Sequence, residues 1–550
     1  MIKWNFRTGK FGRALAITSA VMMVDSCGSA ASDAPQSQND SISNDPPNII
    51  FIFADDLGYG DISLNNDSNT MDSVVDTPNI DAIAARGFNF TNGYVAAPVC
   101  APSRASLMTS HFPSSMGFES NPLIRSDDST RNFSRIGQNI LPIRLKEIGY
   151  STAVIGKWDL GGSLSGEGRI GNASEVGDPE LLPYERGFDY FFGFLAGKNS
   201  YYRTGAGGVP PDGWHLDTAD GFNGTAVQGG TVPSADGGRN IREFGLTGTN
   251  YQPGSQYAHL TPAEHLTDLF TTKALAYIDA HANKEKPFFL YLSYNAPHAP
   301  YHVPDKFYQK YKDLTGSDIT DAKRIYYAMV DQLDTCIGDI LDKLEDEGIA
   351  DNTMIFFLSD NGGVIRNPGG QSGPAYNGGM AGGKFYTLDG GIRVPFVFCW
   401  PAMYQGGQTI TDIVTSLDVM PTLLRAAGYS GKAVKAMNLD GSDLHPYLAK
   451  RQNWPVHDIF FWRCISEIGA ENKAVRYAVR KGNLKYNYYR EPGKAGEEYL
   501  FDLSSNRGEA IYDNLADHPD YLKELMSFKL ALSKWEASMQ PLPAGTPIRN

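Results

Sequence analysis

The chain has 550 residues, enough to bury a large core in one or several domains. Lys and Arg total 48 against 62 Asp and Glu, and the net charge of −14 argues against nucleic acid as a partner. An anionic ligand is not excluded, because a few local cations can set the sign of the charge inside a cleft.

The N-terminus predicts export from a bacterium, to the periplasm or the outer membrane. Basic residues within 3–13 precede an apolar run, 14–24, that is too short to span a bilayer, so we interpret residues 1–27 as a signal peptide. Cys27 lies where a bacterial lipoprotein is lipidated, which would be the protein's only membrane attachment. We prefer lipidation slightly to ordinary cleavage, and an uncleaved anchor is the weaker alternative. The polar composition of residues 28–46 predicts a flexible tether.

Apolar runs alternate with helical patterns through residues 47–435. The predicted strands are 48–53, 151–155, 287–294, 354–358 and 394–399, and the predicted helices are 79–86, 138–147, 261–281 and 322–347. Such continuous runs are typical of strands that are buried on both faces of a sheet. The predicted fold class is therefore α/β, with a large doubly wound mixed sheet sandwiched by helices. The glycine-rich segments 162–260 and 365–383 predict long insertions around a site.

Residues 436–550 predict a smaller α+β subdomain. Segments 476–480, 484–486 and 498–502 alternate around glycine turns, as the strands of an antiparallel sheet do, and an amphipathic helix is expected at about 519–539. The chain has five cysteines, too few for a disulfide scaffold. Apart from Cys27 and Cys100 three remain (Cys336, Cys399 and Cys464), so at least one of them is unpaired within the chain.

Polar residues follow the ends of four predicted strands. They are Asp55 and Asp56, Lys157, His298, and the pair Asp360 and Asn361. Because ligands bind beyond the carboxyl ends of the strands in open α/β sheets, we expect these residues to converge on one cleft. The two acidic pairs offer hard oxygen ligands, which suit Ca²⁺ or, as second choice, Mg²⁺, and not zinc. An Asp pair taken alone is more often a solvated turn or a helix cap.

The motif Cys100-Ala101-Pro102-Ser103-Arg104 is followed by Leu107-Met108-Thr109, and it lies some forty-five residues after Asp55-Asp56-Leu57-Gly58-Tyr59-Gly60. This combination resembles the formylglycine signature of the type I sulfatases, in the alkaline-phosphatase-like superfamily. Taken alone, a cysteine is more often a small buried hydrophobe. The resemblance spans about residues 47–515, and the match of both acidic pairs to the family pattern favours a metal site.

The resemblance implies a mechanism. A maturase would oxidise Cys100 to formylglycine, whose hydrated diol attacks sulfur to give a covalent intermediate. One Ca²⁺ would be bound by Asp55, Asp56, Asp360, Asn361 and the modified Cys100. Arg104 would hold the formylglycine, and Lys157 and Lys384 would contact the sulfate. His298, in Pro297-His298-Ala299-Pro300, would donate to the ester oxygen, although a lone histidine is normally structural. Arg393 is interpreted as structural, pairing with Asp389.

Asp159 is the main departure from the family pattern. The sequence Gly156-Lys157-Trp158-Asp159-Leu160-Gly161 places an aspartate where sulfatases commonly have histidine. A carboxylate near a bound sulfate is electrostatically unfavourable unless the metal and the lysines screen it. We expect Asp159 either to act as a general base or to contact a substrate hydroxyl.

The expected substrate is a sulfated polysaccharide or oligosaccharide, an algal galactan such as carrageenan or a glycosaminoglycan. His302, His215 and Trp214 are candidate substrate contacts. The alternatives are a simple arylsulfatase, a phosphatase or phosphonate hydrolase of the same superfamily, and a non-catalytic protein that binds sulfated glycans. The superfamily's phosphatases usually place Ser or Thr at the nucleophile and bind two zinc ions through more histidines than this chain offers. The sequence does not select the sugar or the sulfate position.

Overall fold

The computed structural model describes most of the chain after residue 44. The described residues are 45–66, 75–121, 137, 139–160, 181–195, 197, 201, 214–216, 241–244, 258–260, 264–365, 372–450, 452–467, 473–505, 509–542 and 546, with the backbone alone for 214–216, 241–244, 258–260, 467 and 511. The predicted signal peptide, Cys27, nearly all of the tether and most of segment 162–260 lie outside them. No helix among the described residues is long and apolar enough to cross a membrane.

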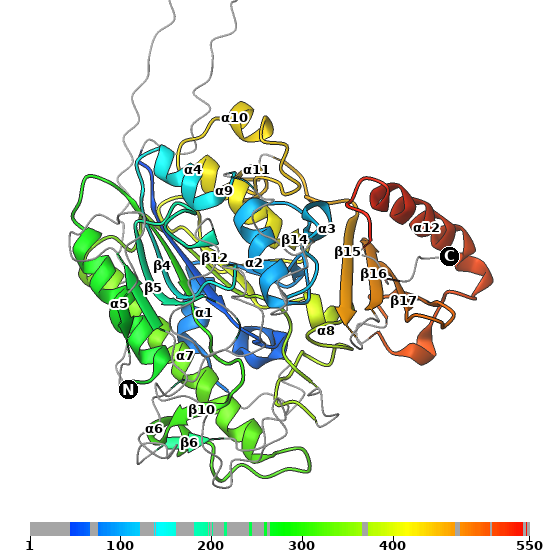
Figure 1. Cartoon of the computed structure of the whole chain (residues 1–550), viewed down its shortest axis with the longest axis horizontal. Helices are drawn as coiled ribbons and strands as arrows, with labels where there is room; N and C mark the ends of the chain where they lie inside the picture. The colour runs from blue at the N-terminus through cyan, green and yellow to red at the C-terminus, as the bar shows by residue number, and fades with distance from the viewer. Residues whose placement is uncertain are drawn as a thin grey trace, which may run out of the picture. The chain divides into compact units, whose positions relative to one another are not determined.

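A large mixed sheet forms the centre of the structure (Figure 1). It has ten strands, in the order β13-β2-β12-β11-β1-β9-β4-β5-β7-β8. The strands are β13 (Gln408–Ile410), β2 (Gly87–Phe90), β12 (Phe396–Cys399), β11 (Thr353–Ser359), β1 (Asn48–Ala54), β9 (Phe288–Ser293), β4 (Ser151–Lys157), β5 (Tyr190–Phe194), β7 (Ile241–Phe244) and β8 (Ala258–Leu260). The five strands from β11 to β5 are parallel. Antiparallel pairing begins on either side of them, at β12 and at β7. The predicted mixed α/β fold is therefore confirmed.

Helices cover both faces of this sheet because its strands are apolar on both sides. In β1, Ile50 and Ile52 belong to one core, and Ile49, Phe51 and Phe53 belong to the other. The first core is closed by α1 (Pro78–Ala85), α5 (Leu266–His281) and α7 (Asp321–Asp346). The second is closed by α2 (Cys100–Thr109), α4 (Leu141–Glu147) and α9 (Val419–Ala426).

Short elements complete the region. They are α3 (Pro113–Met116), α6 (Asp305–Tyr308), α8 (Asp389–Ile392), α10 (Gly431–Lys435) and α11 (His445–Leu448), and two small sheets that pair β10 (His302–Pro304) with β6 (Trp214–Leu216) and β14 (Val414–Thr415) with β3 (Gly93–Tyr94).

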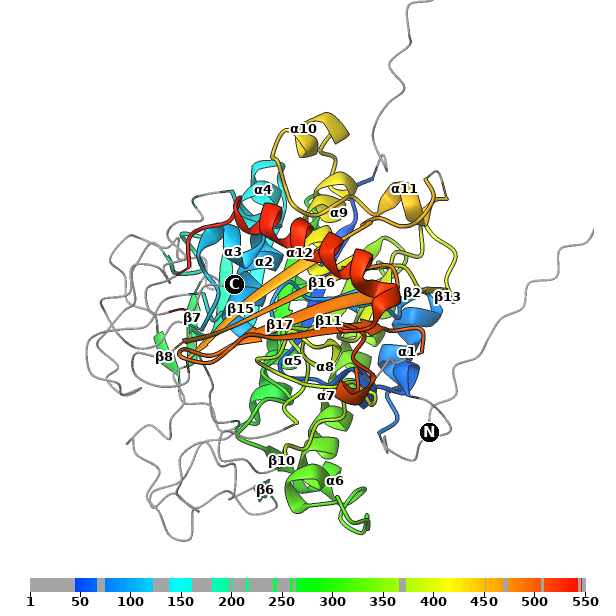
Figure 2. The same ribbon diagram turned by 90° about the vertical axis from the view of Figure 1, so that its right-hand side faces the viewer.

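The C-terminal part is a four-stranded antiparallel sheet with one helix on its outer side (Figure 2). Its elements are β15 (Phe460–Glu467), β16 (Lys473–Lys481), β17 (Leu484–Arg490), β18 (Glu497–Asp502) and α12 (Leu522–Glu536). Val475 and Val479 pack on α12. Ala478 lies on the opposite face of the sheet and belongs to a cluster with Tyr94 and Ile392. The predicted sheet and helix are confirmed, β15 was not predicted, and the boundary at residues 435 and 436 stays a prediction.

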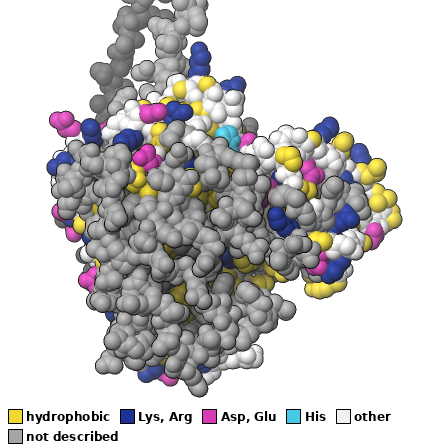
Figure 3. Space-filling model, in the orientation of Figure 1, with side chains coloured by type: hydrophobic (Ala, Val, Ile, Leu, Met, Phe, Trp, Pro, Cys, Tyr) yellow, Lys and Arg dark blue, Asp and Glu magenta, His cyan; other side chains and the backbone are white. Residues whose placement is uncertain are grey.

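Helix α12 is apolar on its outer side as well. Leu522, Met526 and Leu530 lie four residues apart and are 48%, 71% and 58% exposed. Hydrophobic side chains are visible along the outer edge of this part of the molecule (Figure 3). Leu525, Phe528 and Leu532 face the sheet instead and are buried.

Buried charges join the C-terminal sheet to the large one. Lys485 on β17 is fully buried and pairs with Asp389 (2.7 Å) and Glu509 (2.9 Å). Asp389 also accepts a hydrogen bond from the hydroxyl of Tyr94 at 2.9 Å, and Arg393 lies 3.6 Å from it, which is the pairing expected from the sequence. Burial raises the pKa of Glu509 to about 7, against the opposing effect of Lys485.

Replacing Lys485 with methionine is expected to destabilise the protein by about 3–5 kcal/mol, because it removes the buried cation that pairs with Glu509 and leaves Asp389 paired with Arg393. Lys481→Met on the neighbouring strand is the matched control, since Lys481 is half-exposed and its loss should cost less than about 0.5 kcal/mol. Urea unfolding of both variants measures the difference. Equal midpoints for the two variants would show that Lys485 does not hold the junction together.

Candidate active site

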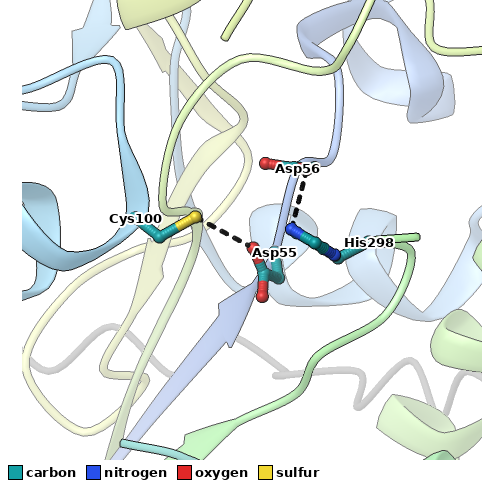
Figure 4. A group of neighbouring side chains, drawn as sticks. All are labelled: Asp55, Asp56, Cys100 and His298. Carbon is teal, nitrogen blue, oxygen red and sulfur yellow. Dashed lines mark hydrogen bonds and ion pairs between the residues drawn. The ribbon is translucent and has the colours of Figure 1, made fainter. Parts of the chain in front are cut away.

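The polar residues predicted to share one cleft do lie together at the carboxyl ends of the parallel strands. Asp55 and Asp56 follow β1, Asp360 and Asn361 follow β11, and Lys157 is the last residue of β4. The segment after β9 brings His298, and Cys100 is the first residue of α2 (Figure 4). All of these side chains are buried.

Cys100 lies beside a carboxylate that is held by a lysine. Its Sγ is 3.6 Å from Oδ1 of Asp55, and the Lys157 ammonium lies 2.8 Å from Oδ2 of the same group. Burial raises the pKa of the Cys100 thiol well above its usual value. Burial would also raise the pKa of Asp55, but the charge of Lys157, with His298 and Arg104, outweighs it and lowers the pKa to about 2. An unmodified Cys100 is therefore a protonated thiol at neutral pH, which is a poor nucleophile.

The carboxylate of Asp56 contacts Lys384, Asn361 and His298. Its carboxylate lies 2.8 Å from the ammonium of Lys384, accepts a hydrogen bond from Nδ2 of Asn361 at 2.7 Å and is 3.5 Å from Nε2 of His298. Its φ of 61° is in the left-handed region, a strained backbone state that occurs preferentially at functional sites.

Arg104, one turn along α2 from Cys100, ties three strand ends together. Its guanidinium donates to Oδ2 of Asp360 from Nε (3.1 Å) and Nη2 (2.7 Å), and it donates to the hydroxyl of Ser293 at the end of β9. Asp55 lies 3.6 Å away. The side chain is fully buried, so it fixes the carboxylates around Cys100 and balances their charge.

Gly156 is required for Lys157 to reach the site. It has a φ of +109°, and a Cβ at this position would lie 1.9 Å from the carbonyl oxygen of Ser293. Only glycine lets β4 approach β9 this closely at the point where Lys157 turns toward Asp55.

The donor atoms fit a hard divalent cation. Ligand atoms of Asp55, Asp56, Cys100 and His298 all lie within 4.8 Å of one another. The side-chain oxygen of Asn361 is buried and has no hydrogen-bond partner among the described residues, although its amide nitrogen makes two hydrogen bonds. A buried amide oxygen left over beside carboxylates suits Ca²⁺ or Mg²⁺. Asp360 keeps Oδ1 for the site, because Arg104 engages only Oδ2, and among the described residues Oδ1 accepts a hydrogen bond from the Asp56 N–H at 3.2 Å.

His298 is held in one tautomer. Its Nδ1 faces the carbonyl oxygen of Ala299, which can only accept, so Nδ1 carries the proton in the neutral ring. Nε2, which faces Asp56, can therefore donate a proton only from the imidazolium. Burial, followed by the charge of Lys384, lowers the pKa of His298.

The hydroxyl of Tyr201 fixes the segment that carries His298. It donates to the carbonyl oxygens of Asn295 and His298, the latter at 2.9 Å, and the side chain is fully buried. Nothing in the local sequence marks this role, because the residues around Tyr201 show no periodic pattern.

Residues 47–429 match the family described as Sulfatase. The chain belongs to the sulfatase family. It is 30% identical to human N-acetylgalactosamine-6-sulfatase over 79% of this chain and 70% of that one. It is also 30% identical to bovine arylsulfatase A, over 90% of this chain and 89% of that one. The crystal structure of Ps i-CgsB in complex with k-i-k-neocarrahexaose has a TM-score of 0.67 at 28% identity and covers 90% of this chain and 94% of that one. The chain is therefore a sulfuric ester hydrolase.

Asp159, the departure from the sulfatase pattern, is tied to Lys157. Its Oδ2 lies 3.4 Å from the Lys157 ammonium, and its Oδ1 accepts a hydrogen bond from the Gly197 N–H at 2.8 Å. Although burial would lower the pKa of Lys157, Asp159 and then Asp55 raise it above its usual value. Asp159 therefore keeps Lys157 charged, in a backbone conformation with a φ of 56°.

The structure describes the side chain of only one of the three candidate substrate contacts, His302. The His302 side chain is 8% exposed, and its ring meets the edge of Tyr201. Trp214 and His215 lie on β6, which pairs with β10, but their side chains lie outside the described residues.

Cys100, Cys336, Cys399 and Cys464 are all free thiols in the structure.

Proposed function

We propose that this sulfatase removes sulfate from a sulfated polysaccharide or its oligosaccharides, a galactan such as carrageenan or a glycosaminoglycan. The observation that carries the proposal is the likeness, over 90% of the chain, to a protein whose structure holds k-i-k-neocarrahexaose. The similarity to N-acetylgalactosamine-6-sulfatases supports a carbohydrate ester as well. The sequence of residues 1–46 supports an exported protein, with Cys27 as a lipid anchor.

The proposed nucleophile is a formylglycine made from Cys100 by a maturase, and when formed it would supply a geminal diol in place of the thiol. The motif around Cys100, and its place beside Asp55 in the group of possible metal ligands, support this modification. A Ca²⁺ held by Asp55, Asp56, Asp360 and Asn361 would neutralise sulfate oxygens.

The lysines and the histidine supply the remaining chemistry. The ammonium groups of Lys157 and Lys384 each lie 2.8 Å from a carboxylate of the site. Both are therefore held in place before the substrate binds and can contact the sulfate oxygens. As the imidazolium, His298 would give its Nε2 proton to the departing sugar oxygen. Burial and then the charge of Lys384 lower its pKa, so the imidazolium gives up this proton readily.

Asp159 is proposed to act as the general base in the place of the family histidine, or to contact a substrate hydroxyl. Asp159→Asn keeps the acceptor for Gly197 but cannot take a proton, so kcat should fall about 10²-fold if Asp159 is the base. Asp159→His should restore much of that loss. A rise in KM with unchanged kcat would assign Asp159 to a substrate hydroxyl instead. If both variants keep the wild-type kcat and KM, Asp159 has neither role.

The likeness to arylsulfatase A over most of both chains favours a second candidate, a simple arylsulfatase. Sulfate release from a panel of carrageenan and glycosaminoglycan oligosaccharides, measured beside 4-methylumbelliferyl sulfate, separates the two. Higher kcat/KM on at least one oligosaccharide supports the proposal. Turnover of the aryl ester alone would make the protein an arylsulfatase.

A further inference from the structure

A partly exposed aromatic and cationic surface lies directly beside the reactive centre. Phe385 and Tyr386 follow Lys384 in the chain and are 39% and 42% exposed, among the few large hydrophobic side chains that the described residues leave open to solvent. Phe385 has a φ of 76°, a costly backbone state for an aromatic residue. Its N–H donates at 2.8 Å to the carbonyl oxygen of Pro98, two residues before Cys100. The backbone that carries these rings is thus hydrogen-bonded to the segment that carries the nucleophile.

The C-terminal sheet supplies a cation to the same surface. Cys464, Arg476 and Tyr489 lie opposite one another on β15, β16 and β17 and form one row across the sheet. Cys464 Sγ lies 3.8 Å from the carbonyl oxygen of Phe385, which places this row against the Phe385 segment. The Arg476 guanidinium lies over two rings, 4.9 Å from the centroid of Tyr386 and 4.5 Å from that of Tyr489.

The two arginines of this sheet face have different surroundings. Arg480, four residues along β16, is buried and donates to the hydroxyl of Tyr94 in the charged junction. Arg476 is only partly buried, and its one hydrogen bond among the described residues is to the Ser466 hydroxyl at 2.8 Å. It forms no ion pair with a described carboxylate, and Glu491, two residues after Tyr489, pairs with Lys494 instead. This face of the sheet is therefore buried at Arg480, whereas Arg476 is partly exposed and has no ion-pair partner among the described residues.

We propose that Phe385, Tyr386 and Arg476 form a subsite for a second, anionic sugar of the substrate, next to the sugar whose sulfate is removed. Arg476 binds the sulfate or carboxylate of that sugar through two N–H groups, and a ring face packs against its C–H groups. Because the net charge of the chain is −14, binding of an anionic sugar depends on local cations such as Arg476. The inference rests on the proposed carbohydrate substrate. It implies that the C-terminal sheet, through Arg476, helps to select substrates that carry a second anionic sugar.

The test uses Arg476→Met, which keeps an unbranched apolar side chain beside the rings of Tyr386 and Tyr489 and removes the charge. The full-length enzyme is assayed on k-i-k-neocarrahexaose, which carries several sulfates, and on 4-methylumbelliferyl sulfate, which carries one. The ratio of kcat/KM for the hexaose to kcat/KM for the aryl ester should fall about 10- to 100-fold, chiefly through KM. Arg476→Lys should recover part of that ratio, and Lys481→Met on the same strand should leave it at the wild-type value.

An unchanged ratio in Arg476→Met overturns the subsite, as does an equal loss on both substrates, because the latter marks a structural role. If the wild-type enzyme hydrolyses the aryl ester but no sulfated oligosaccharide, the proposed function fails and the subsite fails with it. If the wild-type enzyme hydrolyses the hexaose and only the ratio is insensitive to Arg476, the proposed function stands and the subsite alone is wrong.

Discussion

Replacing Cys100 with alanine is expected to lower kcat by at least about 10⁴-fold, the scale of loss when an enzyme loses its nucleophile. The reason is local. Cys100 is the side chain at the start of α2 that faces Asp55, and no other described cysteine lies in the group of possible metal ligands. KM should change much less, because Lys157 and Lys384 remain to bind sulfate.

Cys336→Ala provides the matched control for this loss. Cys336 is an equally buried free thiol, but it lies on α7 and contacts Asp268, away from the active site. This variant should keep the wild-type kcat, with at most a modest loss of stability. Retention of more than about one-tenth of the wild-type kcat in Cys100→Ala would show that the nucleophile lies elsewhere.

Removing divalent cations is expected to abolish turnover and to lower the melting temperature. An ion that binds only the folded chain stabilises it by about 2.7 kcal/mol when present at a hundred times its Kd. The enzyme should therefore melt at a lower temperature after treatment with EDTA and recover when Ca²⁺ is added back. Differential scanning fluorimetry measures the shift without reference to activity.

Variants of Asn361 connect that shift to the proposed site. Asn361→Leu removes the unpaired buried oxygen and should abolish the Ca²⁺-dependent rise in melting temperature, whereas Asn361→Asp keeps a ligand oxygen and should retain it. Asn483→Leu, in an exposed turn, is the control and should respond as the wild type does. A full Ca²⁺ response in Asn361→Leu would place the ion elsewhere.

The sequence was informative where chemistry and strand periodicity coincide. The continuous apolar run of β1 and the polar pair that ends it predict both a buried parallel strand and a place for ligands, and the structure has both. The fit to the sulfatase pattern made Cys100, Lys157 and Lys384 recognisable although they are far apart in the chain. Lys157 reaches the site at the end of β4, whereas Cys100 at the start of α2 and Lys384 in the segment before α8 are brought to the same edge of the sheet by the tertiary fold.

The features that were missed depend on contacts that periodicity does not encode. Strand β15 has large apolar residues on both sides, since Phe460 and Trp462 pack toward the large sheet and Ile465 packs toward α12, so it shows no alternation. The role of Tyr201 arises from its hydroxyl reaching two backbone carbonyls nearly a hundred residues away. Arg476 meets Tyr386 only because the C-terminal sheet packs beside α8.

The most direct test of the account is the mass of the tryptic peptide that spans residues 87–104 and contains Cys100 as its only cysteine. When the protein is produced together with a formylglycine-generating maturase, this peptide should be lighter than the cysteine form by about 18 Da, the change from thiol to aldehyde. Sulfate release should increase with the converted fraction. An unmodified cysteine in a preparation that nevertheless releases sulfate would contradict the proposed nucleophile.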